Sequence, residues 1–322
     1  MLGVNITILN NISSIKNIEF LLLLLIEIFS IICTLYLLIY FLFHWRFMVI
    51  KSLPNQSIVL LIIVSFLYII FDLPFTINSY YFGSDYSQIL SFCLFRNWVH
   101  YTLICNNLYL VATSSIQRYF LLFKIHLLRK RQTRWILHYI PLISCIIYPP
   151  IFYLITIIFY SCTSTDIINS QYCTTPCYFQ NSILLIIDCI IHYILPLIIT
   201  ISANIVLICW MIHLRCDLNI EQMYLWKRQK KLISQILIFS LFYIIGWLPS
   251  TIVFALNAFS LNKLDQYGSV VVWLNYMSYF ICPLQPFICL ILVPEPIYFL
   301  QDTLRQLLRK AMMRTSVITV EA

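Results

Sequence analysis

Long apolar segments separated by short polar connections dominate the chain. A helix needs about 20 apolar residues to cross a bilayer, and its backbone polar groups must be paired internally because hydrocarbon offers them no partner. Seven segments meet this requirement: residues 18–43, 57–80, 94–121, 135–160, 183–213, 232–258 and 269–293. The pattern therefore predicts an all-α fold, a seven-transmembrane-helix bundle.

The third segment, 94–121, is the most polar of the seven. It contains Asn97, His100, Asn106 and Asn107, besides several hydroxyl side chains. Polar groups within the membrane face the interior of a bundle, because their exposure to lipid is costly. We therefore expect other helices to surround this segment.

The residues after the seventh segment predict a short amphipathic helix over 294–310. Its apolar side chains fall on one helical face, with Arg305, Arg309 and Lys310 largely on the other. The apolar set is Ile297, Leu300, Leu304, Leu307 and Leu308. We divide the chain into an extracellular tail 1–17, a membrane domain 18–293, this helix and a cytoplasmic tail 311–322.

Charge distribution orients the bundle. The chain is 61% hydrophobic and 10% charged, with a formal net charge of +8. With the N-terminus outside, Lys16, Arg96 and Lys263 lie outside, and the other basic side chains except Arg118 lie in cytosolic connections. Basic residues concentrate on the cytoplasmic side of membrane proteins. The sequence thus predicts a multi-pass protein of the cell membrane with a cytoplasmic C-terminus, and the lipid bilayer, not nucleic acid, as the partner of its positive charge.

Two kinds of covalent modification agree with this orientation. The glycosylation sequons at Asn5 and Asn11 fall on the outer side, whereas the sequon at Asn55 falls in the cytosol. The cysteines at helix ends or in the loop 161–182 also lie outside, where disulfides can form. These are Cys93, Cys162, Cys173 and Cys177.

Five sequence features occur one after another along the spans. Cys93 begins the third segment and Gln117-Arg118-Tyr119 ends it; Pro196 lies in the fifth, Gly246-Trp247-Leu248-Pro249 in the sixth, and Gln285-Pro286 in the seventh. Together with the amphipathic helix, this set resembles the rhodopsin-like G-protein-coupled receptors over nearly the whole chain. The matching family motifs are D-R-Y, C-W-x-P, N-P-x-x-Y and the cysteine of the third helix.

The resemblance implies a receptor that passes a ligand signal to a heterotrimeric G protein, without enzymatic activity, cofactor or metal. Arg118 and Tyr119 would contact the G protein, and Trp247 with Pro249 would influence the conformation of the sixth helix. Pro196 and Pro286 would provide further flexible points. For each residue a simpler alternative exists: Arg118 could extend towards the lipid headgroups, Trp247 could serve packing, and the prolines could be ordinary helix kinks.

The sequence departs from the family at several inner positions. Gln117 replaces the acid before Arg118, so the local carboxylate partner of that arginine is missing. Ser65 occupies the position of the family's sodium-binding aspartate, and Asn107, Gln285 and Cys289 replace other residues of the inner polar relay. The resemblance therefore predicts a divergent member without a sodium site, and with Arg118 weakly restrained.

Ionisable groups within the spans indicate the ligand pocket, because such groups are usually functional. The set assigned to the pocket is Asp72, Arg96, His100, Asp188, His192, Trp247, Asn275 and Tyr279. Asp188, His192 and Pro196 share a helical face through their spacing of four, and His100 stands where amine receptors carry an aspartate. The alternative is that Asp72, Asp188, His100 and His192 simply hydrogen-bond to one another.

The resemblance also pairs Cys93 with Cys177, or alternatively with Cys173. A disulfide-tied outer loop and polar, tyrosine-rich helix ends favour a peptide ligand, with a small molecule as the alternative.

Two rival classes were compared. A secondary transporter predicts an internal repeat and glycine-interrupted spans, but no repeat is visible and the chain has four glycines. A membrane enzyme of the histidine-box kind predicts clustered histidines, whereas the six histidines are scattered.

Overall fold

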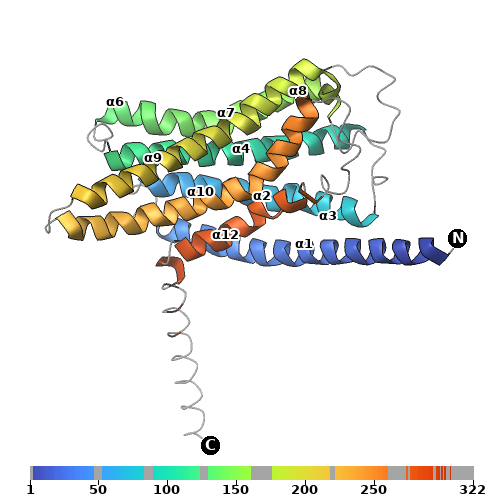
Figure 1. Ribbon diagram of the computed structural model, residues 1–322, viewed down its shortest axis with the longest axis horizontal. Helices are drawn as coiled ribbons and strands as arrows, with labels where there is room; N and C mark the ends of the chain where they lie inside the picture. Colours follow the sequence, from blue (N-terminus) through green and yellow to red (C-terminus); the bar gives the residue numbers. More distant parts are fainter. Residues whose placement is uncertain are drawn as a thin grey trace, which may run out of the picture.

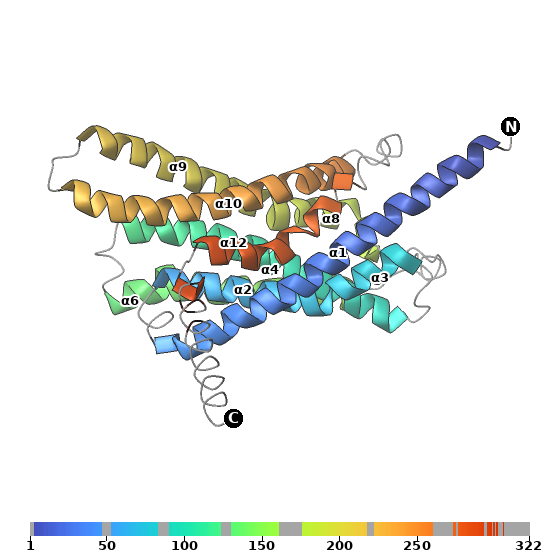
Figure 2. The same ribbon diagram turned by 90° about the horizontal axis from the view of Figure 1, so that it is seen from below.

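The structure, a computed structural model, describes residues 3–46, 53–82, 90–123, 130–160, 176–217, 222–259, 273–274, 276–292, 295–297, 299, 301 and 305. These residues form helices and their connections, with no strand among them. The helices run side by side along the long axis (Figure 1). Helix α1 (Gly3–Phe43) crosses the others obliquely, and its N-terminal part projects beyond them (Figure 2).

Within this described part of the chain, five helical stretches are long and apolar enough to cross a membrane, and a shorter apolar helix is Tyr276–Leu292. The five are Asn17–Phe43, Asn55–Asn78, Arg131–Phe159, Ser182–Trp210 and Leu237–Phe259. Large apolar side chains such as Ile205 and Ile245 are exposed on these helices, as expected where lipid replaces water as the solvent. The helices indicate a multi-pass membrane protein.

The predicted third span is helix α4 (Leu90–Phe123), and it is too polar to qualify by hydropathy. It packs against α2 (Leu53–Phe71), α7 (Ile140–Tyr153) and α9 (Leu195–Asp217). All side chains from Thr102 to Leu108 are buried. The expectation that other helices surround this segment is confirmed, because its asparagines and histidine face protein instead of lipid.

The predicted second span is interrupted at Asp72, which separates α2 from α3 (Leu73–Phe82). Pro74 has no backbone N–H and disfavours a regular helix in the turn before it. The backbone hydrogen bonds from Asp72 N to Tyr68 O (3.0 Å) and from Thr76 N to Asp72 O (3.1 Å) carry the chain across the break. The interruption places a carboxylate between two consecutive helical segments of this span.

The predicted fourth span is built from α6 (Arg131–Arg134), η3 (Trp135–Tyr139), α7 and η4 (Leu154–Phe159). Both η3 and η4 are π-helical. The η3 turn ends just before Pro141, which cannot donate the hydrogen bond of a regular helix. π-helical turns are rare, and they often mark functional positions.

The predicted fifth span likewise contains a π-helical turn, η7 (Cys189–Ile194), between α8 (Ser182–Asp188) and α9. A short 3₁₀ helix, η6 (Cys177–Gln180), precedes α8, and Asn181 caps α8 through its side-chain oxygen. Asp188 and His192 still meet across this turn, because Nδ1 of His192 lies 2.8 Å from Oδ1 of Asp188.

Helix α10 (Gln222–Phe259) and α12 (Ile281–Leu292) pack directly against each other. They approach closely at Gly246, where an added Cβ atom would lie 2.6 Å from Cγ1 of Ile281. Pro249 and Pro286 lie inside these two helices. The absence of a side chain at Gly246 therefore permits this close approach.

At both ends of the chain, helical structure continues beyond the predicted membrane domain. The predicted tail 1–17 is helical from Gly3 onward, so Asn5 and Asn11 lie in α1. At the other end, the described residues of 294–310 are helical, and the ring of Phe299 packs on Tyr40 of α1 and on His44, which follows that helix. This contact fixes the start of the predicted amphipathic segment against the bundle.

Candidate functional site

Asp72 and His100 form a pair between the α2–α3 break and α4. Nδ1 of His100 donates to Oδ2 of Asp72 at 2.8 Å. The Asp72 side chain is fully buried, whereas that of His100 is 22% exposed. The second carboxylate oxygen, Oδ1, has no hydrogen-bond partner among the described residues. The pair is thus a buried carboxylate reached from the surface through a partly exposed imidazole.

Tyrosine rings and one arginine belong to the surroundings of this pair. The rings of Tyr68 and His100 have centroids 6.5 Å apart. Tyr279 of the 276–292 helix lies within electrostatic range of both Asp72 and Arg96. Four predicted pocket residues, Asp72, Arg96, His100 and Tyr279, therefore gather between α2, α4 and the last apolar helix. Asn275 lies outside the described residues.

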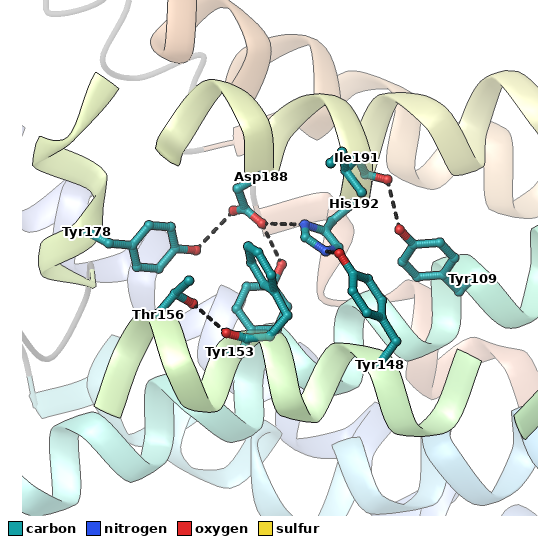
Figure 3. Close-up of polar contacts among 9 residues, drawn as sticks. Tyr109, Tyr148, Tyr153, Thr156, Tyr178, Asp188, Ile191 and His192 are labelled. Carbon is teal, nitrogen blue, oxygen red and sulfur yellow. Dashed lines mark hydrogen bonds and ion pairs between the residues drawn. The ribbon is translucent and has the colours of Figure 1, made fainter. Parts of the chain in front are cut away.

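A second, fully buried network is centred on Asp188 (Figure 3). Its Oδ1 accepts hydrogen bonds from the Tyr153 hydroxyl at 2.9 Å and from Nδ1 of His192 at 2.8 Å. Its Oδ2 accepts from the Tyr178 hydroxyl at 3.0 Å. Burial raises the pKa of the Tyr178 phenol well above its ordinary value, and the Asp188 carboxylate acts in the same direction. Tyr178 therefore stays a neutral donor to this carboxylate.

His192 connects the network to the helices beside it. Its Nε2 lies 3.2 Å from the Tyr148 hydroxyl, and the two rings are stacked with centroids 5.6 Å apart. Tyr109 of α4 donates to the carbonyl oxygen of Ile191 at 3.1 Å, within the π-helical turn (Figure 3). The turn is held by side chains of α4 and α7, and Asp188 together with its donors ties η6 to it.

These contacts are relevant to the two alternatives for the ionisable groups, namely a ligand pocket or simple hydrogen bonding to one another. The aspartates and histidines do hydrogen-bond to one another, but as two separate pairs, Asp72–His100 and Asp188–His192. Only the first pair has a partly exposed member, His100. The Asp188 group has its polar atoms satisfied inside the protein, so we regard it as structural and the Asp72 group as the candidate binding site.

A third polar cluster lies deeper, where α2, α4, α10 and α12 meet. The hydroxyls of Ser65 and Tyr243 both lie at hydrogen-bond distance from Oδ1 of Asn107, at 3.3 and 3.4 Å, and from Oε1 of Gln285. Nδ2 of Asn107 donates to the Leu103 carbonyl at 3.1 Å. None of the four side chains carries a charge, and all are buried. We call Ser65, Asn107, Tyr243 and Gln285 the neutral relay.

Trp247 lies one helical turn beyond Tyr243 on α10. It is 3% exposed, and its indole N–H has no hydrogen-bond partner among the described residues. It packs in the central apolar cluster with Tyr276 and Ile281. Pro249 is two residues from Trp247 in the sequence, and Pro286 is next to Gln285. Pro196 follows the π-helical turn η7. The three prolines thus lie beside the buried polar groups.

Arg118 lies near the C-terminal end of α4, and its side chain is buried, with 5% exposure. Neither of the two Asp–His pairs involves Arg118, and no carboxylate of the described residues pairs with it. Gln117 accepts a hydrogen bond from Ser57 at 2.8 Å and donates to the His138 carbonyl at 3.0 Å. Gln117 therefore joins α4 to α2 and η3, while Tyr119 is partly exposed beside it.

Cys93 and Cys177 are each disulfide-bonded, and Cys162 and Cys173 lie outside the described residues. The free cysteines described within the spans, including Cys105, Cys145 and Cys282, are buried except for Cys209, which is exposed. Among the residues that the structure describes, no group of three His, Cys, Asp or Glu side chains could hold a metal ion.

Several members of these clusters were missed in the sequence. Tyr243 of the neutral relay and Tyr153 and Tyr178 of the Asp188 network stand among 22 tyrosines, and nothing in the pattern distinguishes them. His138, whose Nε2 donates to Oε1 of Gln56 at 2.8 Å, is one of the six scattered histidines and was not selected. Hydrogen bonds between distant helices leave no periodic signal.

Comparison of the sequence with protein-family models and with curated proteins gives no match.

Proposed function

We propose that the protein is a divergent rhodopsin-like G-protein-coupled receptor, which converts binding of an extracellular ligand into activation of a heterotrimeric G protein at its cytoplasmic face. In this proposal it has seven spans: the five long apolar stretches, the buried polar helix α4 and the Tyr276–Leu292 helix. The protein itself forms no covalent bond with the ligand. It changes the nucleotide state of its partner by changing shape.

The observation that carries the proposal is the neutral relay. Ser65, Asn107 and Gln285 were singled out because they stand where the family places its inner polar residues, although their side chains differ. Asn107 and Gln285 lie 42 and 220 positions from Ser65 along the chain, and yet the three side chains meet at one point. A chance resemblance of short motifs gives no reason for this convergence, whereas a shared helix arrangement does.

The arrangement suits a two-state mechanism, in which one bundle has two packings separated by a small free-energy difference. Trp247 and Tyr243 lie on α10 between the outer pair and the inner end, so a ligand that displaces Trp247 acts on the relay. Pro249 weakens the helix at this level because it lacks a backbone donor. Rotation of the inner half of α10 then frees a surface beside Arg118 and Tyr119.

The ligand enters, in this proposal, beside the Asp72–His100 pair, and a peptide is favoured over a small molecule. Cys93 and Cys177 would be joined to each other, so that η6 and the loop before it are tied to the outer end of α4. Arg96 and Tyr279 would extend the same surface for ligand contact.

The test is guanine-nucleotide exchange on mixed G proteins by the purified, membrane-reconstituted full chain, with Arg118→Ala as the variant. We expect exchange above the protein-free rate for the wild type and loss of that excess for Arg118→Ala. Arg46→Ala removes an exposed positive charge at the inner end of α1 and should leave exchange unchanged. If wild type and Arg118→Ala give equal exchange with every G protein and candidate ligand, the proposal is wrong. Solute uptake that tracks expression would instead favour a transporter.

A further inference from the structure

An open cavity of about 350 Å³ lies at one end of the fourth span, outside all the polar clusters described above. It is lined by Arg131, Arg134, Trp135 and Tyr139. Arg131 and Trp135 are exposed, and the rings of Trp135 and Tyr139 have centroids 5.0 Å apart. Two guanidinium groups and two aromatic rings therefore border one small surface cavity.

The chemistry of this lining suits a phosphate group. Guanidinium groups bind phosphate through paired, charge-assisted hydrogen bonds. The sequence from 124 to 160 contains no aspartate or glutamate, whereas Lys130 adds a further exposed positive charge next to Arg131. The local excess of positive charge thus favours an anionic ligand.

An apolar stripe continues from the cavity along the same span. The isoleucines on this face recur at intervals of three or four residues and are 39–61% exposed. They are Ile136, Ile140, Ile143, Ile147, Ile151, Ile155 and Ile158. Trp and Tyr side chains are enriched where the hydrocarbon meets the headgroups. The order of charge, aromatic ring and apolar stripe matches the order of headgroup, interface and acyl chain in a phospholipid.

The cavity also lies at the end of the bundle where anionic lipid is expected. Helix α6 lies at the same end as the start of α10 and opposite the N-terminus of α1 (Figures 1 and 2). The charge distribution assigns that end to the cytosol, and the cytoplasmic leaflet holds most of the anionic lipid. A soluble phosphate would gain nothing from the isoleucine stripe, so the arrangement favours a lipid.

We propose that Arg131, Arg134, Trp135 and Tyr139 form a binding site for the headgroup of an anionic phospholipid of the cytoplasmic leaflet, whose acyl chains lie along the isoleucine stripe. The site requires that the fourth span crosses the membrane, but it does not require coupling to a G protein. Its occupation would hold the inner end of this span at the membrane surface.

The first experiment is native mass spectrometry of the purified full chain titrated with phosphatidylserine or phosphatidylcholine. We expect tighter binding of phosphatidylserine, and a loss of about tenfold or more in its affinity for Arg131→Gln/Arg134→Gln, since each basic residue near an anionic membrane contributes measurably to attraction. The matched control is Lys227→Gln/Arg228→Gln, which removes the same charge at the same end. Soluble glycerophosphoserine should not displace the lipid.

Equal losses in the two double variants would mean that only overall charge matters, and the proposal would be wrong. Competition by glycerophosphoserine at equal concentration would overturn the choice of a lipid. A second measurement needs no change of charge: phosphatidylserine brominated near the headgroup should quench tryptophan fluorescence less in Trp135→Phe than in the wild type. Equal quenching in the two proteins would place the lipid elsewhere. None of these outcomes depends on nucleotide exchange.

Discussion

At the scale of single residues, the Asp188 carboxylate accepts hydrogen bonds from three buried side chains. Three donors, from Tyr153, Tyr178 and His192, point at its two oxygens, and all four side chains are buried. Removing the acceptor leaves three buried donors unpaired, and each of these costs about 1–3 kcal/mol. The stability of this part of the bundle should therefore depend strongly on this one side chain.

We predict that Asp188→Leu lowers the free energy of unfolding by about 3–5 kcal/mol, the range for breaking one side of a buried charged pair. Tyr148→Phe, which removes only the 3.2 Å contact to His192, should lower it by about 1 kcal/mol. Thermal unfolding of the detergent-purified protein measures both. Similar midpoints for the two variants would show that Asp188 does not organise the network.

Also at residue scale, the neutral relay predicts indifference to sodium. Ser65, Asn107, Tyr243 and Gln285 provide oxygen atoms but no carboxylate, and an unpaired cation is costly to bury without a compensating charge. Replacing potassium by sodium at constant ionic strength should leave the unfolding midpoint of the wild type unchanged. Ser65→Asp introduces the missing charge and should acquire sodium-dependent stabilisation, because a ligand that binds only the folded state stabilises it. A sodium-dependent midpoint in the wild type would refute the prediction.

At the scale of elements, the contact between α10 and α12 depends on Gly246. A Cβ atom there would lie 2.6 Å from Cγ1 of Ile281, well inside contact distance. Trp247 and Pro249 follow on α10, and Gln285 and Pro286 follow on α12. A displacement at Gly246 is therefore passed to the residues through which we propose the signal to travel.

We predict that Gly246→Ala destabilises the protein by about 1–3 kcal/mol through overpacking, after allowance for the better helix propensity of alanine. Ile281→Ala removes the atoms that the new Cβ would meet, so the double variant should be more stable than the sum of the single effects implies. A double-mutant cycle on unfolding midpoints provides the measurement. Additive effects would mean that the two helices separate freely at this point.

At the scale of the whole molecule, the orientation can be tested with the sequons. With the N-terminus outside, Asn5 and Asn11 are accessible to glycosylation and Asn55 is not. In a eukaryotic membrane, glycosidase treatment should shift the mass of the wild type and of Asn55→Gln, but not that of Asn5→Gln/Asn11→Gln. A shift that disappears only in Asn55→Gln would reverse the proposed orientation.

The site was only partly predictable from the sequence, and for a physical reason. His100 and Asp188 could be selected because ionisable groups in apolar segments are rare, but their partners could not. The spacing of Asp188 and His192 indicated a shared face, although the π-helical turn η7, which begins after Asp188 and contains His192, leaves no clear pattern in an apolar run. Likewise, the break at Asp72 follows from Pro74, while the meeting of Asp72 with His100 on α4 depends on how two helices pack.

The sequence by itself determined the helical, membrane-spanning class, the burial of the polar α4 and the short list of ionisable residues, because these depend on local hydrophobicity and on the cost of polar groups in lipid. Only the tertiary structure decided which polar groups are paired: Asp72 with His100, Asp188 with two tyrosines and His192, and Ser65 with Gln285. Those pairings arise between helices that are far apart in the chain, and side-chain packing, not local periodicity, determines them.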